Sequence, residues 1–528
     1  LADPVPLDES FFDLGGHSIL ATRLVFQLRQ KLGVHVPLGL VFDAPTIAQL
    51  AAATDQICSG GTDFLIAAPD AAKENVSSGD LNYAKDAQAL ENELPASFMR
   101  AMPAKEPRVV LLTGATGFLG AYILADLLGK RRNHVEKVYV HVRANDADSA
   151  QQRLRNALAG RGLWREAWEQ EGRVQAVVGD LSKPHLGLND ADWAHLVEEV
   201  HVIVHNGALV HWVYPYSKLR AANVLSTMEV MRLANEGQPK SVAFVSSTSA
   251  LDTEHYIRFS DTSAQGVLES DSLDGSASDL KSGYGQSKWV AERLLMTAAS
   301  RGLAAAIIRP GYVVGDSKTA VTNTDDFLFR LIKGSAQLGL IPDMNNTINM
   351  VPVDHVARVT SLAGLAATQW PENRQTHAAV FHVTSHPTIR YNEFLGALIE
   401  YGWNVRPAEY LEWRTALENH VLASAAAGNT GLDADSNALF PLLHFVLDDL
   451  PTSTKSPELN DANTTKLLTE AHELDVVRGV DVPLVGLYLS WLVAVGFLPP
   501  PASKSARALP TLPEGVARQA MGRGSAAV

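Results

Sequence analysis

Cysteine is almost absent from this sequence: Cys58 is the single one among 528 residues. One cysteine cannot form an intrachain disulfide, so a reducing cytoplasm is the expected location. Positive charge is also scarce, because 44 Lys and Arg stand against 58 Asp and Glu, giving a net charge of −14. This balance argues against nucleic-acid binding, which needs cations to neutralise phosphates.

Long hydrophobic runs are missing as well. The most apolar stretch, 484–498, is bounded by Pro483 and Pro499 and falls short of the roughly 18 residues that a membrane span needs. It predicts a buried C-terminal helix, and we expect no membrane association. The N-terminus has no basic segment followed by an apolar run, so no secretory signal is expected, and the chain opens without Met, as an excised fragment would. No heptad pattern is present, so we expect a monomer.

The length is too great for one hydrophobic core and predicts two or three domains. Residues 1–55 have the apolar spacing of a small helical unit, and residues 56–80 are rich in Ser, Gly, Asp and Ala, as flexible linkers are. From residue 108 short apolar strands alternate with helices, which predicts a doubly wound parallel sheet. Its expected strands are 109–112, 138–142, 174–178, 202–204, 242–245 and 305–308.

We therefore expect a small all-α unit, a four-helix bundle, followed by a Rossmann-type α/β domain with a smaller, mainly helical C-terminal part. The expected α/β domain covers 81–502, with nucleotide binding in about 107–315 and substrate binding mostly in 316–502. The Pro-, Ala- and Gly-rich segment 503–528 is expected to be a disordered tail.

A serine near the N-terminus has the setting of a modification site. Gly15-Gly16 supplies a turn, and Ser18 opens an amphipathic run whose first N–H groups would favour a phosphate. A helix cap would explain Ser18 equally well. The longer string 11–20, FFDLGGHSIL, resembles the peptidyl carrier domains of nonribosomal peptide synthetases. The resemblance implies 4′-phosphopantetheine on Ser18, attached by a phosphopantetheinyl transferase.

A glycine loop between the first strand and its helix predicts a dinucleotide site. One glycine lets the chain turn, the second admits a pyrophosphate close to the backbone, and the third lets helix and sheet pack. Glycines also end strands for structural reasons alone. The residues expected to hold the cofactor here are Thr113, Gly114, Thr116, Gly117, Phe118, Leu119 and Gly120.

The ends of the next strands bear on the choice of dinucleotide. In an NAD-binding protein, a carboxylate at the end of the second strand would bind the ribose. This chain has Arg143 there, and its guanidinium, assisted by that of Arg153, favours the 2′-phosphate of NADPH. Asp180-Leu181 resembles the adenine contact of short-chain dehydrogenases, and Asn206 would lie on the nicotinamide side. Ordinary turn chemistry would also account for Asp180 and Asn206.

Tyr284 and Lys288 are four residues apart and share one face of a helix. A nearby ammonium favours tyrosinate, so Tyr284 could give a proton to a forming oxyanion while Lys288 holds the nicotinamide ribose. Thr248, after the fifth strand, is the expected third catalytic residue, with Ser247 as the alternative. Such a pair also occurs as an ordinary helix-surface pair, but its order after the glycine loop and hydroxyl cluster resembles the extended short-chain dehydrogenases.

Longer strings resemble the C-terminal half of fungal α-aminoadipate reductases. They are 206–220 (NGALVHWVYPYSKLR), Asn223-Val224, 247–253 (STSALDT), 345–355 (NNTINMVPVDH) and 491–500 (WLVAVGFLPP). The resemblance implies NADPH-dependent reduction of an acyl thioester tethered to Ser18, with Thr248 and Tyr284 bonding the oxygen and an aldehyde leaving. Fungal carboxylic acid reductases share this layout, so aryl or other acyl groups stay open. Family members carry an upstream adenylation domain; this chain lacks it, so we expect it to need a preloaded carrier.

Substrate contacts are expected in the loop after the fourth strand, although aromatic and His clusters more often serve packing. The candidates are His211, Trp212, Tyr214, Tyr216 and, as cations for an aminoadipate carboxylate, Lys218 and Arg220. Two other functions have to be weighed: a sugar-nucleotide or ketone reductase of the same fold, and a non-catalytic docking module. The attached carrier argues against the former, and the intact catalytic trio argues against the latter.

Overall fold

The computed structural model describes residues 6–9, 11, 14, 18–34, 36, 40–58, 81–101, 107–211, 214–368, 378–426, 437–443, 446, 450–451, 454–503 and 507–516. Its centre is a seven-stranded sheet in which every neighbouring pair is parallel. The order is β11-β6-β5-β4-β1-β2-β3, which confirms the predicted doubly wound sheet. The strands are β1 (Arg108–Thr113), β2 (Val135–Val142), β3 (Val174–Val178), β4 (Val202–His205), β5 (Ser241–Val245), β6 (Ala305–Pro310) and β11 (Ala379–Val383).

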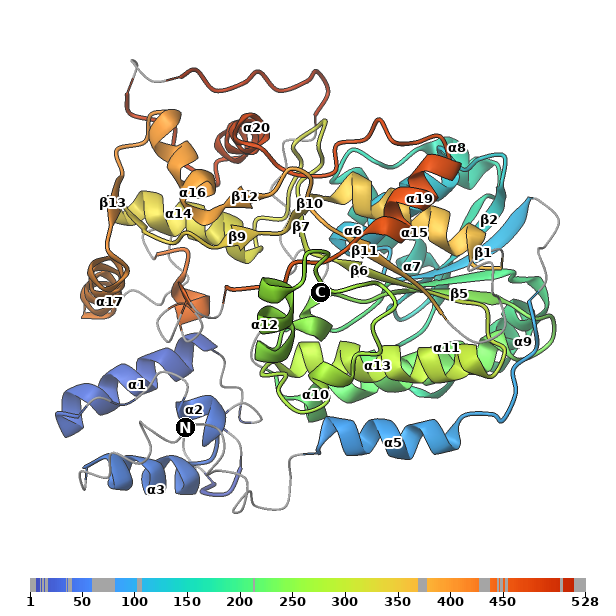
Figure 1. Ribbon diagram of the computed structural model, residues 1–528, viewed down its shortest axis with the longest axis horizontal. Helices are drawn as coiled ribbons and strands as arrows, with labels where there is room; N and C mark the ends of the chain where they lie inside the picture. The colour runs from blue at the N-terminus through green and yellow to red at the C-terminus, as the bar shows by residue number, and fades with distance from the viewer. Residues whose placement is uncertain are drawn as a thin grey trace.

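Helices cover both faces of this sheet, as its almost wholly apolar strands require. In Figure 1, the upper face carries α6 (Phe118–Leu128), α7 (Ala147–Ala159), α8 (Glu166–Gln170), α15 (Val353–Ala366) and α19 (Ala462–Glu470). The lower face carries α5 (Tyr83–Glu93), α9 (Asp190–Glu199), α10 (Tyr216–Arg220), α11 (Ser226–Ala234) and α13 (Gly283–Ser300). The strand order reverses between β1 and β4, where sheets of this kind bind ligands beyond the strands' carboxyl ends.

A second apolar core lies beside the sheet. It is built from α14 (Phe327–Leu338), α16 (Tyr391–Glu400), α17 (Tyr410–Ala426), α20 (Val482–Ala494) and the pair β8 (Leu340–Pro342) and β13 (Arg406–Ala408). Buried α20 is the C-terminal helix that the sequence predicts. None of the helices within the described residues is long and apolar enough to cross a membrane.

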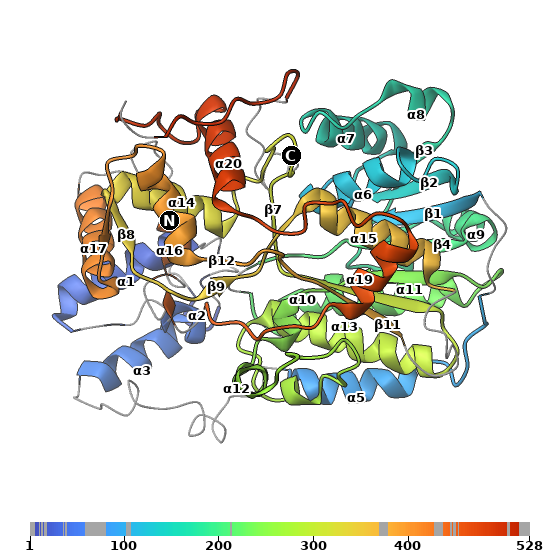
Figure 2. The same cartoon turned by 45° about the horizontal axis from the view of Figure 1, so that its top comes forward.

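The N-terminal helices lie against this second core. They are α1 (Ser18–Leu32), α2 (Leu40–Asp43) and α3 (Ile47–Cys58). Buried Ala21 and Val25 of α1 belong to the same apolar cluster as α14 and α20, and α1 contacts the short turn Phe440–Leu442. Both views place α1 next to α17, with α2 and α3 beyond it and all three helices away from the sheet (Figures 1 and 2).

Two segments differ from the sequence-based expectation. Residues after 315 were assigned mostly to substrate binding, but α15, β11 and α19 return to the central sheet. The tail was expected to be disordered from 503, but residues 507–516 pack on the second core through Leu509, Leu512 and Val516. A hydrogen bond of 2.7 Å from Ser490 Oγ to Pro510 O helps to hold this segment. Composition alone could not reveal these tertiary contacts.

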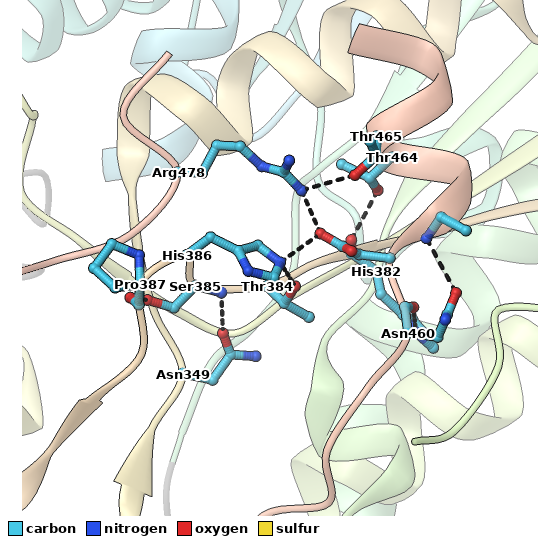
Figure 3. Close-up of polar contacts among 12 residues, drawn as sticks. Asn349, His382, Thr384, Ser385, His386, Pro387, Asn460, Thr464, Thr465 and Arg478 are labelled. Carbon is cyan, nitrogen blue, oxygen red and sulfur yellow. Dashed lines mark hydrogen bonds and ion pairs between the residues drawn. The ribbon is translucent and has the colours of Figure 1, made fainter. Parts of the chain in front are cut away.

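A polar cluster attaches α19 to the end of β11 (Figure 3). Asp461 precedes the first residue of α19 and makes no capping hydrogen bond; instead its carboxylate pairs with Arg478 and lies 2.8 Å from His386 Nε2. Burial alone would raise the pKa of Asp461, but His386 and Arg478 hold it below its ordinary value. Thr464 Oγ1 of the same helix donates to His382 O of β11 at 2.7 Å. The cluster therefore joins three segments that are distant in sequence.

We expect Asp461→Asn to lower the free energy of unfolding by about 1.5–3 kcal/mol at pH 7, because hydrogen bonds to charged groups are lost. A depressed carboxyl pKa stabilises the fold above the ordinary Asp value near 3.9, and this contribution disappears as the pH falls through the folded-state pKa. Urea unfolding at pH 7 and in acid should therefore show the difference shrinking in acid. Asp475→Asn, at an exposed position nearby, is the control; an equal loss at both pH values would contradict the ion-pair explanation.

Candidate active site

The glycine loop has the close backbone contacts that its sequence predicts. Gly114 has φ +76°, and a Cβ there would lie 2.7 Å from Gly207 Cα; a Cβ on Gly120 would lie 2.1 Å from Gly114 O. Helix α6 begins after Gly117 without a side-chain cap, which leaves its first N–H groups available to a phosphate. These observations fit a bound pyrophosphate. Thr113 ends β1, Thr116 lies in the turn, and Phe118 and Leu119 open α6.

Two guanidiniums meet beyond β2. Arg153 on α7 donates from Nη1 to the carbonyl oxygen of Arg143 at 2.9 Å. Partial burial, and then the charge of Arg143, lower the pKa of Arg153, so the pair concentrates positive charge. This arrangement fits the 2′-phosphate of NADPH.

The ends of β3 and β4 also lie against the glycine loop. Asp180 accepts hydrogen bonds from Ser182 N and Oγ at 2.9 and 2.8 Å. Its carboxylate therefore stabilises the turn that follows β3. Leu181 reaches Gly207, where its Cδ1 would be 2.7 Å from an added Cβ. Asn206 Nδ2 is 3.3 Å from Gly114 O. The structure therefore gathers these expected cofactor residues at the switch point of the sheet.

The expected catalytic residues come from two adjoining elements. Tyr284 and Lys288 lie on the first turns of α13, and Lys288 Nζ is 5.7 Å from the centroid of the Tyr284 ring. Lys288 Nζ also donates to Val245 O, at the end of β5, over 2.7 Å. Thr248 begins the 3₁₀ turn η4 (Thr248–Leu251), which follows β5 and contacts α13. The two elements that carry the hydroxyl, the phenol and the amine are thus in contact beyond the carboxyl end of β5.

The neighbouring serine is the weaker candidate for the catalytic hydroxyl. Ser247 Oγ caps η4 by accepting a hydrogen bond from Ser249 N at 3.1 Å. Half-buried Thr248 makes no side-chain hydrogen bond within the described part of the chain. Its hydroxyl is therefore available to a ligand, which favours Thr248 over Ser247.

A buried charge network lies under Lys288. Burial lowers the pKa of Lys288 to about 7, and Glu292, one turn further along α13, opposes this shift. Glu292 and Arg309 of β6 are fully buried and paired, with Arg309 Nη2 at 2.7 Å from Glu292 Oε2. Ser246 donates a further hydrogen bond to Glu292. Glu292 therefore connects the ammonium of Lys288 with the sheet.

Sequence reasoning missed a positioning residue, Asn223. It lies in a π-helical turn (Ala221–Leu225) and is 2% exposed. Its Oδ1 accepts from Leu209 N at 2.7 Å, and its Nδ2 donates to Leu209 O and Ser287 Oγ at 3.0 Å each. It thereby joins the loop after β4 to α13, between Tyr284 and Lys288. The π turn, a feature frequent at functional sites, cannot be seen in the sequence.

The expected substrate residues are only partly brought together. His211 and Tyr214 stack with ring centroids 3.6 Å apart, and Lys218 is exposed on α10. Arg220 is instead held by Asp86 of α5, at 2.7 and 2.9 Å, and buried Tyr216 donates its hydroxyl to the same carboxylate. These two residues fasten α5 to the sheet domain. Trp212 lies outside the described residues; Ser18 is the first residue of α1, and its side chain is not among those described.

Comparison with protein-family models identifies two domains. The model described as phosphopantetheine attachment site matches residues 2–54, and the NAD_binding_4 model, described as male sterility protein, matches residues 112–360. They confirm the predicted carrier domain and the predicted dinucleotide-binding domain.

Curated relatives match both domains together. The L-2-aminoadipate reductase of Schizosaccharomyces pombe is 46% identical over 503 residues, which are 93% of this chain and 34% of that protein. The enzyme of the same name from Saccharomyces cerevisiae is 47% identical over 523 residues, or 96% of this chain and 36% of that protein. The chain therefore spans about a third of the length of these relatives.

Solved structures share the fold. The terminal R domain from the myxalamid PKS-NRPS biosynthetic pathway superposes with a TM-score of 0.67 at 32% identity, covering 79% of this chain and 100% of that one. A thiolation-reductase di-domain from an archaeal non-ribosomal peptide synthetase superposes with a TM-score of 0.66 at 22% identity, covering 94% of both chains. The second match shows the same fold over the carrier and the sheet domain together.

If Lys288 acts as an ammonium, Glu292→Gln should shift the alkaline limb of the kcat/KM profile to lower pH by about one unit, because an opposite charge close by raises an ammonium pKa by that order. One other titratable group interacts with Lys288: His205, which burial keeps neutral with a pKa of about 3. Arg309 is paired with Glu292.

The control for this prediction is Glu473→Gln, which breaks a partly buried pair with Arg131 far from α13. It should cost stability without moving the profile. Thermal unfolding curves identify a temperature at which both variants are folded, and the pH profiles are measured at that temperature. A Glu292→Gln enzyme with an unmoved alkaline limb would exclude Lys288 as the group that titrates there.

Proposed function

The chain belongs to the family of terminal reductase domains of nonribosomal peptide synthetases and is an NADPH-dependent oxidoreductase; from this premise, we propose that it releases a carrier-bound acyl thioester as an aldehyde. The observation that supports the reaction most directly is the joining of two parts on one chain. A phosphopantetheine attachment domain precedes a dinucleotide domain that bears Thr248, Tyr284 and Lys288. A sugar-nucleotide reductase would have no use for such a carrier.

The acyl group in this proposal is L-2-aminoadipoyl, and the pathway is lysine biosynthesis. The support is identity of 42–47% with proteins named L-2-aminoadipate reductase along nearly the whole chain. A second acyl class stays in view because a linear gramicidin synthase subunit is 34% identical over 475 residues. An aryl or peptidyl thioester would use the same Thr248, Tyr284 and Lys288.

Each residue has a separate task in the proposed reaction. Bound NADPH would supply hydride to the thioester carbonyl carbon. Thr248 and Tyr284 donate hydrogen bonds to the oxygen on which charge develops, and Tyr284 gives it a proton. Lys288 stabilises the phenolate left on Tyr284 and orients the cofactor ribose. The hydroxyl proton then returns to Tyr284 as the carbon–sulfur bond breaks, the thiolate takes up a proton from water, and the aldehyde leaves. Thioester, NADPH and one proton thus become aldehyde, thiol and NADP⁺.

The carrier would deliver the acyl group through the arm on Ser18, after a phosphopantetheinyl transferase has modified it and an adenylation domain has loaded it. We propose the boundary made from the sequence between a carrier, residues 1–55, and a linker that ends at residue 80; helix α3 runs to Cys58, so the linker would begin after it. The Ser- and Gly-rich composition of this linker suits movement of the carrier. The proposal includes a monomer in a reducing compartment such as the cytoplasm.

Consumption of NADPH tests the reaction. We expect turnover of an L-2-aminoadipoyl pantetheine thioester and slower turnover of a benzoyl thioester, with aldehyde formed in equal amount to NADP⁺. Tyr284→Phe should lower kcat by about 100-fold or more, because a positioned proton donor is lost, while NADPH binding persists. Preference for the benzoyl thioester would replace the proposed substrate; failure with both, despite bound NADPH, would refute thioester reduction.

Ser18→Ala separates the carrier from the chemistry. We expect this variant to reduce the free pantetheine thioester as the unchanged chain does. When a phosphopantetheinyl transferase and an acyl-coenzyme A are used to attach an acylated arm to the carrier, the variant should show no turnover of that acyl group. The reason is that no other hydroxyl is proposed to take the arm. Carrier-dependent turnover in Ser18→Ala would place the modification elsewhere.

A further inference from the structure

Two charged side chains next to the proposed catalytic residues have no task in the reaction above. Asp252 directly follows η4, whose first residue is Thr248. Lys281 stands three residues before Tyr284, just ahead of α13. Both side chains are exposed, and neither forms a hydrogen bond or close ion pair with the part of the chain that the structure describes.

Close backbone packing keeps these two positions on one side of the site. A Cβ on Gly285 would lie 2.7 Å from Ser249 O, so the first turn of α13 lies directly on η4. A Cβ on Gly283 would lie 2.3 Å from Tyr214 O, in the loop after β4. The segment carrying Lys281, the turn carrying Asp252 and the expected substrate loop therefore converge where Thr248 and Tyr284 meet.

Electrostatic effects show which charged groups interact with Asp252. Surrounding protein raises its pKa to about 6, and the charge of Lys281 opposes the shift, so the two groups interact. Burial raises the pKa of Tyr312, in the short strand β7 (Tyr312–Val314), and Asp252 and Asp326 raise it further. Asp326 caps α14 of the second core. Asp252 and the cap of α14 therefore act on the same tyrosine of β7, while Asp252 itself stays exposed to water.

The substrate in the proposed function has charges that match. An L-2-aminoadipoyl group attached through one carboxyl keeps an ammonium and a second carboxylate. An ammonium is best bound by a carboxylate and a carboxylate by an ammonium, through charge-assisted hydrogen bonds. Leaving either charge unpaired once the bound acyl group has lost part of its water is costly.

We infer that Asp252 and Lys281 recognise this zwitterionic end of the acyl group, Asp252 binding the ammonium and Lys281 the carboxylate. This inference rests on the proposed function and names its specificity-determining residues. Asp252 and Lys281 interact only through their charges and form no hydrogen bond or close ion pair with the described residues, so they can bind the substrate without breaking a close contact. Lys281 would then take the role that the sequence suggests for Lys218 or Arg220, the latter being held by Asp86.

Three thioesters of pantetheine, freshly prepared and assayed with the full 528-residue chain, test each charge separately. They are L-2-aminoadipoyl linked through its side-chain carboxyl, adipoyl, which lacks the ammonium, and 5-aminopentanoyl, which lacks the carboxylate. Asp252→Asn should lower kcat/KM about tenfold for the two amines and leave adipoyl unchanged. Lys281→Met should lower it about tenfold for the two carboxylates and leave 5-aminopentanoyl unchanged.

Asp279→Asn is the matched control, since this exposed aspartate lies two residues before Lys281 and interacts with Ser278. It should change none of the three values. If Asp252→Asn lowered all three equally, or none, recognition of the ammonium would be refuted. A wild-type preference for aminoadipoyl that survives both variants would overturn this inference alone; absence of that preference in the wild type would overturn it together with the proposed substrate.

Discussion

The active site depends on one buried ion pair. Glu292 of α13 and Arg309 of β6 have no solvent exposure, so each needs the other to offset the cost of removing its charge from water. Ser246, directly after β5, donates to the same carboxylate. These contacts fix the rotation and height of α13 on the sheet, one turn beyond Lys288. The positions of Lys288 and Tyr284 beside the end of β5 therefore depend on a pair one turn further along α13.

The sheet was predictable, and the candidate site residues could be placed on its elements, because both signals are local. Short apolar strands, the glycines after β1 and the four-residue spacing of Tyr284 and Lys288 can each be recognised within a few residues. Strand β11 was missed for the opposite reason. Its His382 is buried only because Arg309 and the carbonyl of Asn460, both distant in sequence, provide hydrogen bonds at 3.0 and 2.7 Å.

The same reasoning explains the candidates that changed. Arg220 looked like a free cation in the sequence, since nothing near it suggested that Asp86 would be buried against it. Asn223 and Asp252 lie in strings noted for their resemblance, yet their contacts come from loops that meet only after folding. Long-range pairing decides which charges are satisfied and which remain available to a ligand. A sequence shows the charges and leaves their partners undetermined.

Tethering changes what such available charges have to achieve. An acyl group on a flexible arm is presented at roughly millimolar effective concentration without any contact at its far end. Binding energy at that end is then not needed for capture and can serve to orient the carbonyl between Thr248 and Tyr284. Two charges are enough for this purpose, because opposite signs at separate positions define a direction. A tethered reductase can therefore select its substrate with few residues, placed on the two elements that carry the catalytic groups.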